Sequence, residues 1–229
     1  MATKKKPAKK PVKKAAPKKV VKPAAPQTPQ EYRVPEGKVL CLRTCSSDLK
    51  SHKGFQWPES GPVECPDWSA VPECGNGLHG MLHGEGDYQL LNWDDTAKWL
   101  VVEVEQSVII DLSGKVKFPR GVVVCCGDRR TATDFIIKHG LPGKKVLGGT
   151  ATAGDRGTAT AGYMGTAAAG TYGTATAGAY GCISILWYDI TKNTYRRAVA
   201  EVDGVIIKAN VKYRCDDKGK FVEVAEVAK

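Results

Sequence analysis

The 229 residues allow one or two domains, and no apolar stretch reaches the ~18 residues of a membrane-spanning helix, so we expect no membrane partner. The net charge of +10 comes from one end of the chain. The first 22 residues hold ten lysines and no acidic residue, and removing these ten from the 34 basic residues leaves 24, which equals the number of acidic residues. A uniformly basic protein is thereby excluded.

Residues 1–30 are rich in Lys, Ala and Pro and hold too few large apolar side chains to bury a core, so we expect a disordered tail. The tail resembles the Lys-Ala-Pro tails of linker histones. Clustered ammonium groups bind DNA or RNA phosphates without regard to sequence by releasing counterions; a purely solubilising arm is the alternative. The predicted nucleic-acid contacts are Lys4, Lys5, Lys6, Lys9, Lys10, Lys13, Lys14, Lys18, Lys19 and Lys22.

Residues 38–147 have the composition of a small folded domain, which we expect to be α+β. Apolar runs rich in β-branched residues predict strands at 39–44, 99–105 and 108–112 and within 117–126. A helix is predicted at 131–139, with Gly140 as its stop, and a helical turn at 94–98.

Several segments of this region resemble an uncharacterised domain family of phage and bacterial genomes: LRTCSSDLKSHKGFQWP, CGNGLHG, KWLVVEVE and KVKFPRGVVVCCGDR. In that family such a domain is followed by TATAG-type repeats and a closing segment. The resemblance covers roughly residues 38–225. The family brings no known activity.

Residues 149–180 are four copies of one eight-residue unit, GTATAGDR, GTATAGYM, GTAAAGTY and GTATAGAY. Alternating Thr and Ala predict strands with Ala inward and Thr outward, and glycines at the unit ends permit the positive φ of tight corners. We expect a short β-solenoid over 148–181, with two units in each sixteen-residue coil. A flexible linker is the alternative.

The octads resemble the TAGYGS-like repeats of bacterial ice-nucleation proteins. Ice binding would need a long, flat array of threonines, whereas four units give about two coils. A spacer, or a surface that assembles the chain into a homo-oligomer, fits this length better.

Residues 182–229 are expected to form a β-rich cap that shields the last coil from edge pairing. Strands are predicted at 182–189, 195–202 and 205–209, with Asp203-Gly204 as a two-residue hairpin turn. The N-terminus lacks the apolar segment of a secretory signal, so we expect a cytoplasmic location, in a host cytoplasm or a virion if the protein is phage-encoded. The eight cysteines would then be reduced.

Four residues of the types that zinc prefers as ligands occur with the spacing C-x8-C-x4-H-x3-H: Cys65, Cys74, His79 and His83. Zinc modules usually pair cysteines at a shorter spacing, and glycines around these histidines disfavour a helix. We therefore expect no metal, and attribute these residues to core and loops.

A second arrangement resembles the ADP-ribosyltransferases, in which a first strand carries His or Arg for the nicotinamide cofactor. Arg43 lies in the predicted strand LCLRT, and GNGLH at 75–79 is similar to the GKGIYF-type segment of poly-ADP-ribose polymerases, with His79 where their Tyr falls. The resemblance implies NAD as cofactor and Arg43 and His79 as catalytic candidates. The later strand start that should carry a Glu offers Gly121, so we favour a protein without this activity and without a cofactor.

The sequence thus predicts a non-catalytic, phage-associated accessory or interaction protein. Its basic tail would tether it to nucleic acid, and its repeat would assemble copies or bind a partner. The alternative is an ADP-ribosyltransferase-like enzyme.

Overall fold

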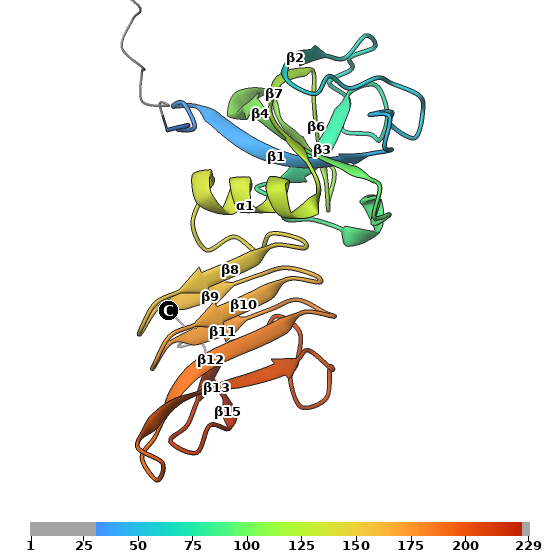
Figure 1. Cartoon of the computed structure of the whole chain (residues 1–229). Helices are drawn as coiled ribbons and strands as arrows, with labels where there is room; N and C mark the ends of the chain where they lie inside the picture. Colours follow the sequence, from blue (N-terminus) through green and yellow to red (C-terminus); the bar gives the residue numbers. More distant parts are fainter. Residues whose placement is uncertain (1–30, 226–229) are drawn as a thin grey trace, which may run out of the picture. The chain divides into compact units, whose positions relative to one another are not determined.

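The computed structural model describes residues 31–225, and the lysines of the N-terminal tail lie outside these residues. In the described part strands dominate, and the single α-helix is α1 (Arg129–His139). The expectation of an α+β domain at 38–147 is therefore wrong, because this region is a β-sheet with one helix beside it (Figure 1). The Trp-, Pro- and Gly-rich stretches between the predicted strands form turns and short strands.

Seven strands of this region form one sheet in the order β2-β7-β4-β1-β3-β6-β5, and every neighbouring pair is antiparallel. The central pair is buried, which explains its nearly continuous apolar sequence. The strands are β1 (Lys38–Cys45), β2 (Gly61–Glu64), β3 (Leu78–Leu82), β4 (Lys98–Glu105), β5 (Ile110–Asp111), β6 (Val116–Phe118) and β7 (Arg120–Gly127).

Two predicted elements of this region differ in the structure. The run 117–126 is two strands, β6 and β7, which Pro119 separates because proline cannot donate to a sheet ladder. The helical turn expected at 94–98 is a turn in which the Asp94 carboxylate accepts a hydrogen bond from the Thr96 N–H at 2.8 Å.

Helix α1 lies between the seven-stranded sheet and the first repeat strand, β8 (Thr150–Ala153) (Figure 1). It begins after Asp128, whose side chain accepts a hydrogen bond from the Thr131 N–H, and it ends at Gly140 as predicted. Ala132 and Ile136 are buried on its inner face.

The expectation of a separate β-solenoid with a cap is wrong. The repeat strands belong to two four-stranded sheets, and non-repeat strands complete both sheets. One sheet has the order β13-β12-β10-β8 and the other β15-β14-β11-β9. Four octads supply only two strands to each sheet, too few to bury their inner faces, so C-terminal strands extend both. The remaining strands are β9 (Thr158–Thr160), β10 (Thr166–Ala169), β11 (Thr174–Thr176), β12 (Cys182–Asp189), β13 (Thr194–Glu201), β14 (Tyr213–Cys215) and β15 (Phe221–Glu223).

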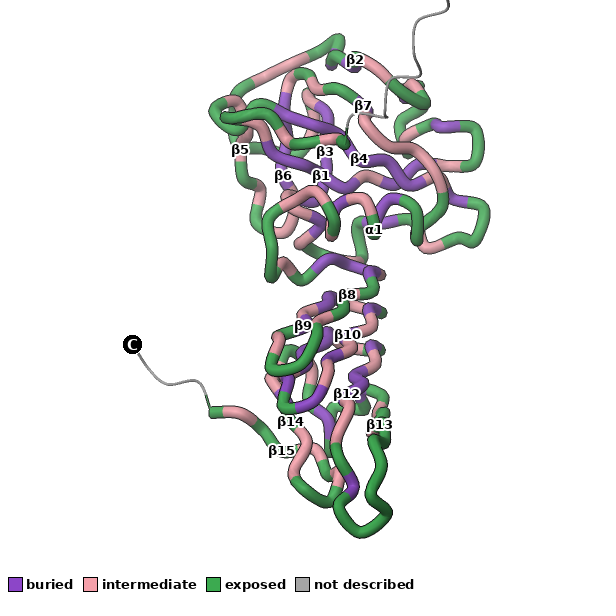
Figure 2. Tube along the Cα trace, turned by 60° about the vertical axis from the view of Figure 1, so that its left-hand side comes forward, coloured by how far each residue is buried: buried purple, intermediate pink, exposed green. Residues whose placement is uncertain are grey.

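Alanines of the repeat face the space between the two sheets, as the alternation predicts. Figure 2 shows buried positions next to partly buried ones along the repeat strands, and in β10 the two alternate. Ala167 and Ala175 are fully buried, and the threonine hydroxyls of Thr158 and Thr174 lie 3.0 Å apart at the surface. The buried set is Ala159, Ala161, Ala167, Ala169, Ala175 and Ala177, joined by Ile183 and Ile185 of β12.

Positive φ in the repeat falls on the eighth residue of each unit and not on the glycines, which corrects the sequence interpretation. Those residues are Arg156, Met164, Tyr172 and Tyr180, with φ between 51° and 59°. The glycines are needed for space instead. A Cβ on Gly178 would lie 2.5 Å from the Tyr163 backbone nitrogen, because successive turns of the chain are in backbone contact there.

Beyond the repeat, β12 and β13 form a hairpin that agrees with the predicted strands. The strand expected at 205–209 and the Asp203-Gly204 hairpin turn are absent from the structure. The carboxylate of Asp203 accepts hydrogen bonds from the N–H groups of Val205, Ile206 and Ile207, and thereby folds this segment into a turn.

Candidate functional site

A cavity of about 550 Å³ opens beside β1 and β3, which is within the size range of small-molecule sites. It gathers residues that are far apart in the sequence. Its wall includes Arg43 of β1, His79 of β3, Cys74 and Lys115 from two loops, and the indole of Trp57. Both transferase candidates thus lie at one cavity.

Arg43 and His79 are linked directly. Nη1 of Arg43 donates to the backbone carbonyl of His79 at 3.5 Å, and the guanidinium carbon lies 5.6 Å from the centre of the Trp57 ring. The imidazole itself accepts a hydrogen bond at Nε2 from the Gly75 N–H, at 3.5 Å. The histidine is therefore held as an acceptor at Nε2, which requires its neutral form.

Burial, together with the nearby charges of Lys115, Arg43 and Lys117, lowers the pKa of His79 to about 4. Its imidazole is uncharged at neutral pH. Three cations thus lie close enough to His79 to disfavour its charged form, and two of them, Arg43 and Lys115, line the cavity.

Cys74 and Lys115 form a pair at the rim. Nζ of Lys115 donates to Sγ of Cys74 at 3.0 Å, and this hydrogen bond lowers the pKa of the thiol. Cys74 is exposed, whereas the other seven free cysteines are buried or half-buried. A lowered pKa and an open position are the conditions under which a thiol reacts fastest.

Lys117, two residues further along the same stretch, is almost completely buried. Its ammonium group donates to the carbonyl of Glu73 at 3.0 Å and lies 5.5 Å from the centre of the Trp68 ring. This anchors the loop that carries Cys74. The i, i+2 spacing of Lys115 and Lys117 is the sequence signal that could have placed both on one face, and our sequence analysis missed it.

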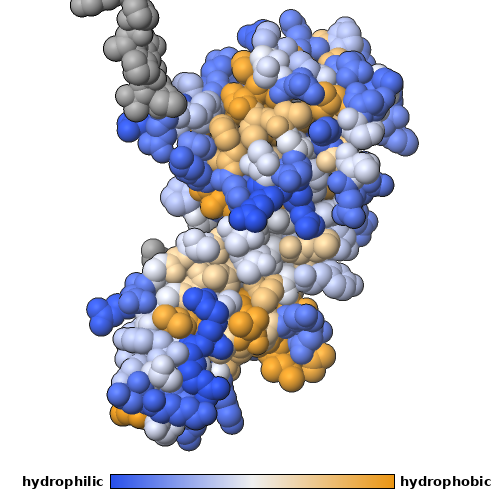
Figure 3. Space-filling model, viewed as in Figure 1, coloured by the Kyte–Doolittle hydropathy of each residue, from blue (hydrophilic) through white to orange (hydrophobic). Residues whose placement is uncertain are grey.

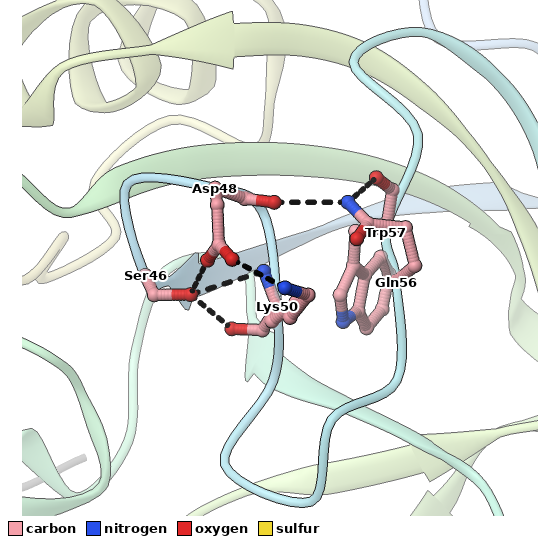
Figure 4. Close-up of polar contacts among 5 residues, drawn as sticks. All are labelled: Ser46, Asp48, Lys50, Gln56 and Trp57. Atoms are coloured by element: carbon pink, nitrogen blue, oxygen red, sulfur yellow. Dashed lines mark hydrogen bonds and ion pairs between the residues drawn. The ribbon is translucent and has the colours of Figure 1, made fainter.

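Trp57 is positioned by the loop that follows β1 (Figure 4). The Ser46 hydroxyl bonds Asp48 and the carbonyl of Lys50, and the Gln56 amide donates to the carbonyl of Asp48 at 2.9 Å. The ring is 2% exposed. These bonds close the loop and leave the indole against Arg43.

The four zinc candidates do not form a metal site. Cys65, Cys74 and His79 line the cavity described above, but His83 lines a different one of about 440 Å³. Sγ of Cys65 donates to Asp67, and Cys74 is paired with Lys115. Within residues 31–225 no group of His, Cys, Asp or Glu side chains is arranged to hold a metal ion.

A glutamate for transferase chemistry is also lacking at this cavity. Gly121 on β7 has no room for a side chain, since a Cβ there would lie 2.7 Å from Cγ1 of Val102. Glu103 is buried in β4 and is not part of the cavity wall. The acidic residue that does line it is Asp67.

Comparison with known families finds a match to part of the chain. Residues 39–137 match a domain of unknown function, DUF7666. No solved structure matches the chain.

Comparison with curated proteins finds bacterial ice nucleation proteins. InaU of Pantoea ananas is 41% identical over 106 residues, which are 45% of this chain and 10% of that protein. Ice nucleation proteins of Pseudomonas syringae and Xanthomonas campestris pv. translucens are 45% and 41% identical over 101 residues, which cover 43% of this chain and 9% and 6% of theirs. The matched segments are longer than the four octads, so the similarity extends beyond the repeat.

The expected cytoplasmic location is wrong, because the curated proteins that the chain matches are ice nucleation proteins. In residues 31–225 no helix is long and apolar enough to cross a membrane. The chain therefore combines a segment that matches DUF7666 with moderate similarity to ice nucleation proteins over 101 to 106 residues.

Proposed function

We propose that this chain is a non-enzymatic, phage-associated accessory or interaction protein that is tethered to nucleic acid by its N-terminal tail. The observation that carries the proposal is the separation of charge: ten lysines in the first 22 residues, and a neutral remainder. Affinity of this kind depends on released counterions, so it ignores sequence and falls steeply with salt.

The test compares the full chain with a chain that lacks residues 1–26 and with a full-length chain whose ten tail lysines are glutamines. Fluorescence anisotropy with a labelled DNA duplex measures affinity at several salt concentrations. We expect the unaltered full chain to bind and the other two proteins not to bind. The logarithm of its binding constant should fall against the logarithm of salt concentration with a slope of roughly −0.9 for each phosphate contacted. Equal binding by the truncated chain would refute the tether.

The repeat is the second interaction element of the proposal, for partner binding or for assembly of copies. Tyr172 and Tyr180 are each 76% exposed, which is unusual for large aromatic side chains. Figure 3 shows a mostly pale surface over the repeat, of small and weakly polar residues, next to strongly hydrophilic ones. Such a surface suits protein contact better than it suits a charged ligand.

Assembly is tested by sedimentation velocity on the full chain and on a Tyr172→Ser, Tyr180→Ser variant. We expect a concentration-dependent larger species for the full chain that the double variant lacks. A monomer at every concentration in both would remove self-assembly from the proposal and leave partner binding.

One observation favours a second candidate function, the binding of NAD. Arg43 and His79, which resemblance to the ADP-ribosyltransferases would place at the cofactor, line the same cavity. Calorimetry with NAD on the unaltered protein and on Arg43→Ala tests this. Heat that the variant loses would support the candidate, and no heat at millimolar NAD would exclude it.

A further inference from the structure

The side chains that line the cavity beside β1 and β3 carry more positive than negative charge. Arg43, Lys53 and Lys115 line it, and the acidic residue on its wall is Asp67. The Asp67 carboxylate accepts a hydrogen bond from Sγ of Cys65 at 2.9 Å. The wall therefore holds more positive than negative charge.

Two buried donors at this cavity have no acceptor. Among the described residues, the buried side-chain nitrogen or oxygen atoms without a hydrogen-bond partner are Nε of Arg43 and Nε1 of Trp57. Both residues line the cavity, and they contact each other through the guanidinium and the indole ring. Buried donors are nearly always paired, so two orphans side by side indicate a missing acceptor.

We propose that this cavity binds a small anionic ligand through its phosphate or carboxylate group, with Arg43 and Lys115 as the cationic contacts and Trp57 as an additional donor. Arginine forms two parallel hydrogen bonds to such oxyanions, and a low-dielectric wall strengthens them. Phe55, which is half-buried on the cavity wall, supplies an apolar surface for the remainder of the ligand. The inference concerns a different part of the chain from the nucleic-acid tether and does not require NAD to bind.

Cys74 provides a local reporter of this site. It lies on the cavity wall beside Lys115 and is the exposed cysteine of the chain. Iodoacetate is an anion and iodoacetamide is neutral, but both alkylate the same thiolate. The ratio of their rates is therefore independent of the thiol pKa and measures only the preference of the cavity for an anion.

The experiment uses the full chain and follows Cys74 by peptide-resolved mass spectrometry, so that anions bound by the tail give no signal. We expect the iodoacetate-to-iodoacetamide ratio to be at least about threefold higher in the folded protein than in the urea-unfolded chain. Arg43→Gln and Lys115→Gln should each lower it toward the unfolded value. The matched control is Lys192→Gln, which removes the same charge from an exposed turn between β12 and β13.

Protection distinguishes the two ligand groups. Inorganic phosphate and acetate are added separately, with chloride at equal ionic strength as the reference. Slower alkylation of Cys74 by both reagents in phosphate alone assigns a phosphate ligand, and in acetate alone a carboxylate ligand. If neither anion protects and the ratio equals that of the unfolded chain, the cavity has no anion preference and the proposal is wrong. Circular dichroism on each variant verifies that the fold is intact.

Discussion

The ring of Tyr88 stacks on the ring of Tyr163, with centroids 3.7 Å apart and planes 9° from parallel. Tyr88 begins the 3-10 helix η1 (Tyr88–Leu90), which follows β3 in the chain. Tyr163 is the seventh residue of the second octad. Trp93 adds an edge contact to Tyr163 and donates from Nε1 to the carbonyl of Tyr88 at 2.8 Å. The stack attaches the first part of the chain to the repeat.

Replacing Tyr163 by Ala should therefore destabilise the protein. The loss of a half-buried ring with three aromatic contacts should lower the free energy of unfolding by about 1–3 kcal/mol. Urea denaturation followed by tryptophan fluorescence measures this. Tyr172→Ala, at a ring that is 76% exposed, is the matched control and should cost under ~0.5 kcal/mol. Equal losses would show that the stack contributes nothing specific.

The glycine at the sixth position of the octad offers a matched pair. In Gly178→Ala the new Cβ would lie 2.5 Å from the Tyr163 nitrogen, so the chain must shift at a cost of about 1–3 kcal/mol. Gly154 occupies the same position in the first octad, and a Cβ there would meet nothing within 4 Å. We expect Gly154→Ala to be neutral in thermal denaturation and Gly178→Ala to lower Tm. If both are neutral, backbone proximity is not the reason for the glycine.

Enlarging an inward alanine should separate the two facing sheets. Ala161 is 1% exposed, so Ala161→Leu should lower the free energy of unfolding by about 1–3 kcal/mol through overpacking. Thr158 is exposed and keeps its hydroxyl in Thr158→Ser, so that change should have little effect. Thermal denaturation of both variants provides the comparison. A larger loss in the serine variant would contradict the assignment of the inner face.

Acid should destabilise the protein partly through His79. The folded-state pKa of about 4 lies below the ordinary value of 6.5, so the unfolded chain binds more protons as the pH falls from 6.5 toward 4. Stability contributed by this group is complete above 6.5 and declines below it. His79→Gln should reduce the slope of unfolding free energy against pH in this window, measured by urea denaturation. Part of the slope will remain, because burial also lowers the pKa of His83.

The matched control for this pH dependence is His52→Gln, at an exposed histidine on the rim of the same cavity. The change of slope in His79→Gln is judged against the change in this variant. Equal changes in the two would mean that His79 is solvated in the folded protein.

Local signals in the sequence determined the repeat strands, their inward alanines and helix α1 with its stop at Gly140, because alternation and capping depend on near neighbours. Tertiary structure alone decided that non-repeat strands complete both repeat sheets. The reason is that two repeat strands cannot bury their inner face by themselves, and strands from elsewhere in the chain must cover it. It also decided why glycine is needed in the octads, because the backbone of the neighbouring turn leaves no room for a Cβ at positions such as Gly178. It decided as well that the Asp203 carboxylate binds backbone N–H groups, so that the segment folds into a turn in place of the predicted hairpin. The cavity is the strongest case. Arg43, Trp57, Cys74 and Lys115 come from separate segments, and only the packing of β1 against β3 and the anchoring of their loops give them one environment and one positive potential.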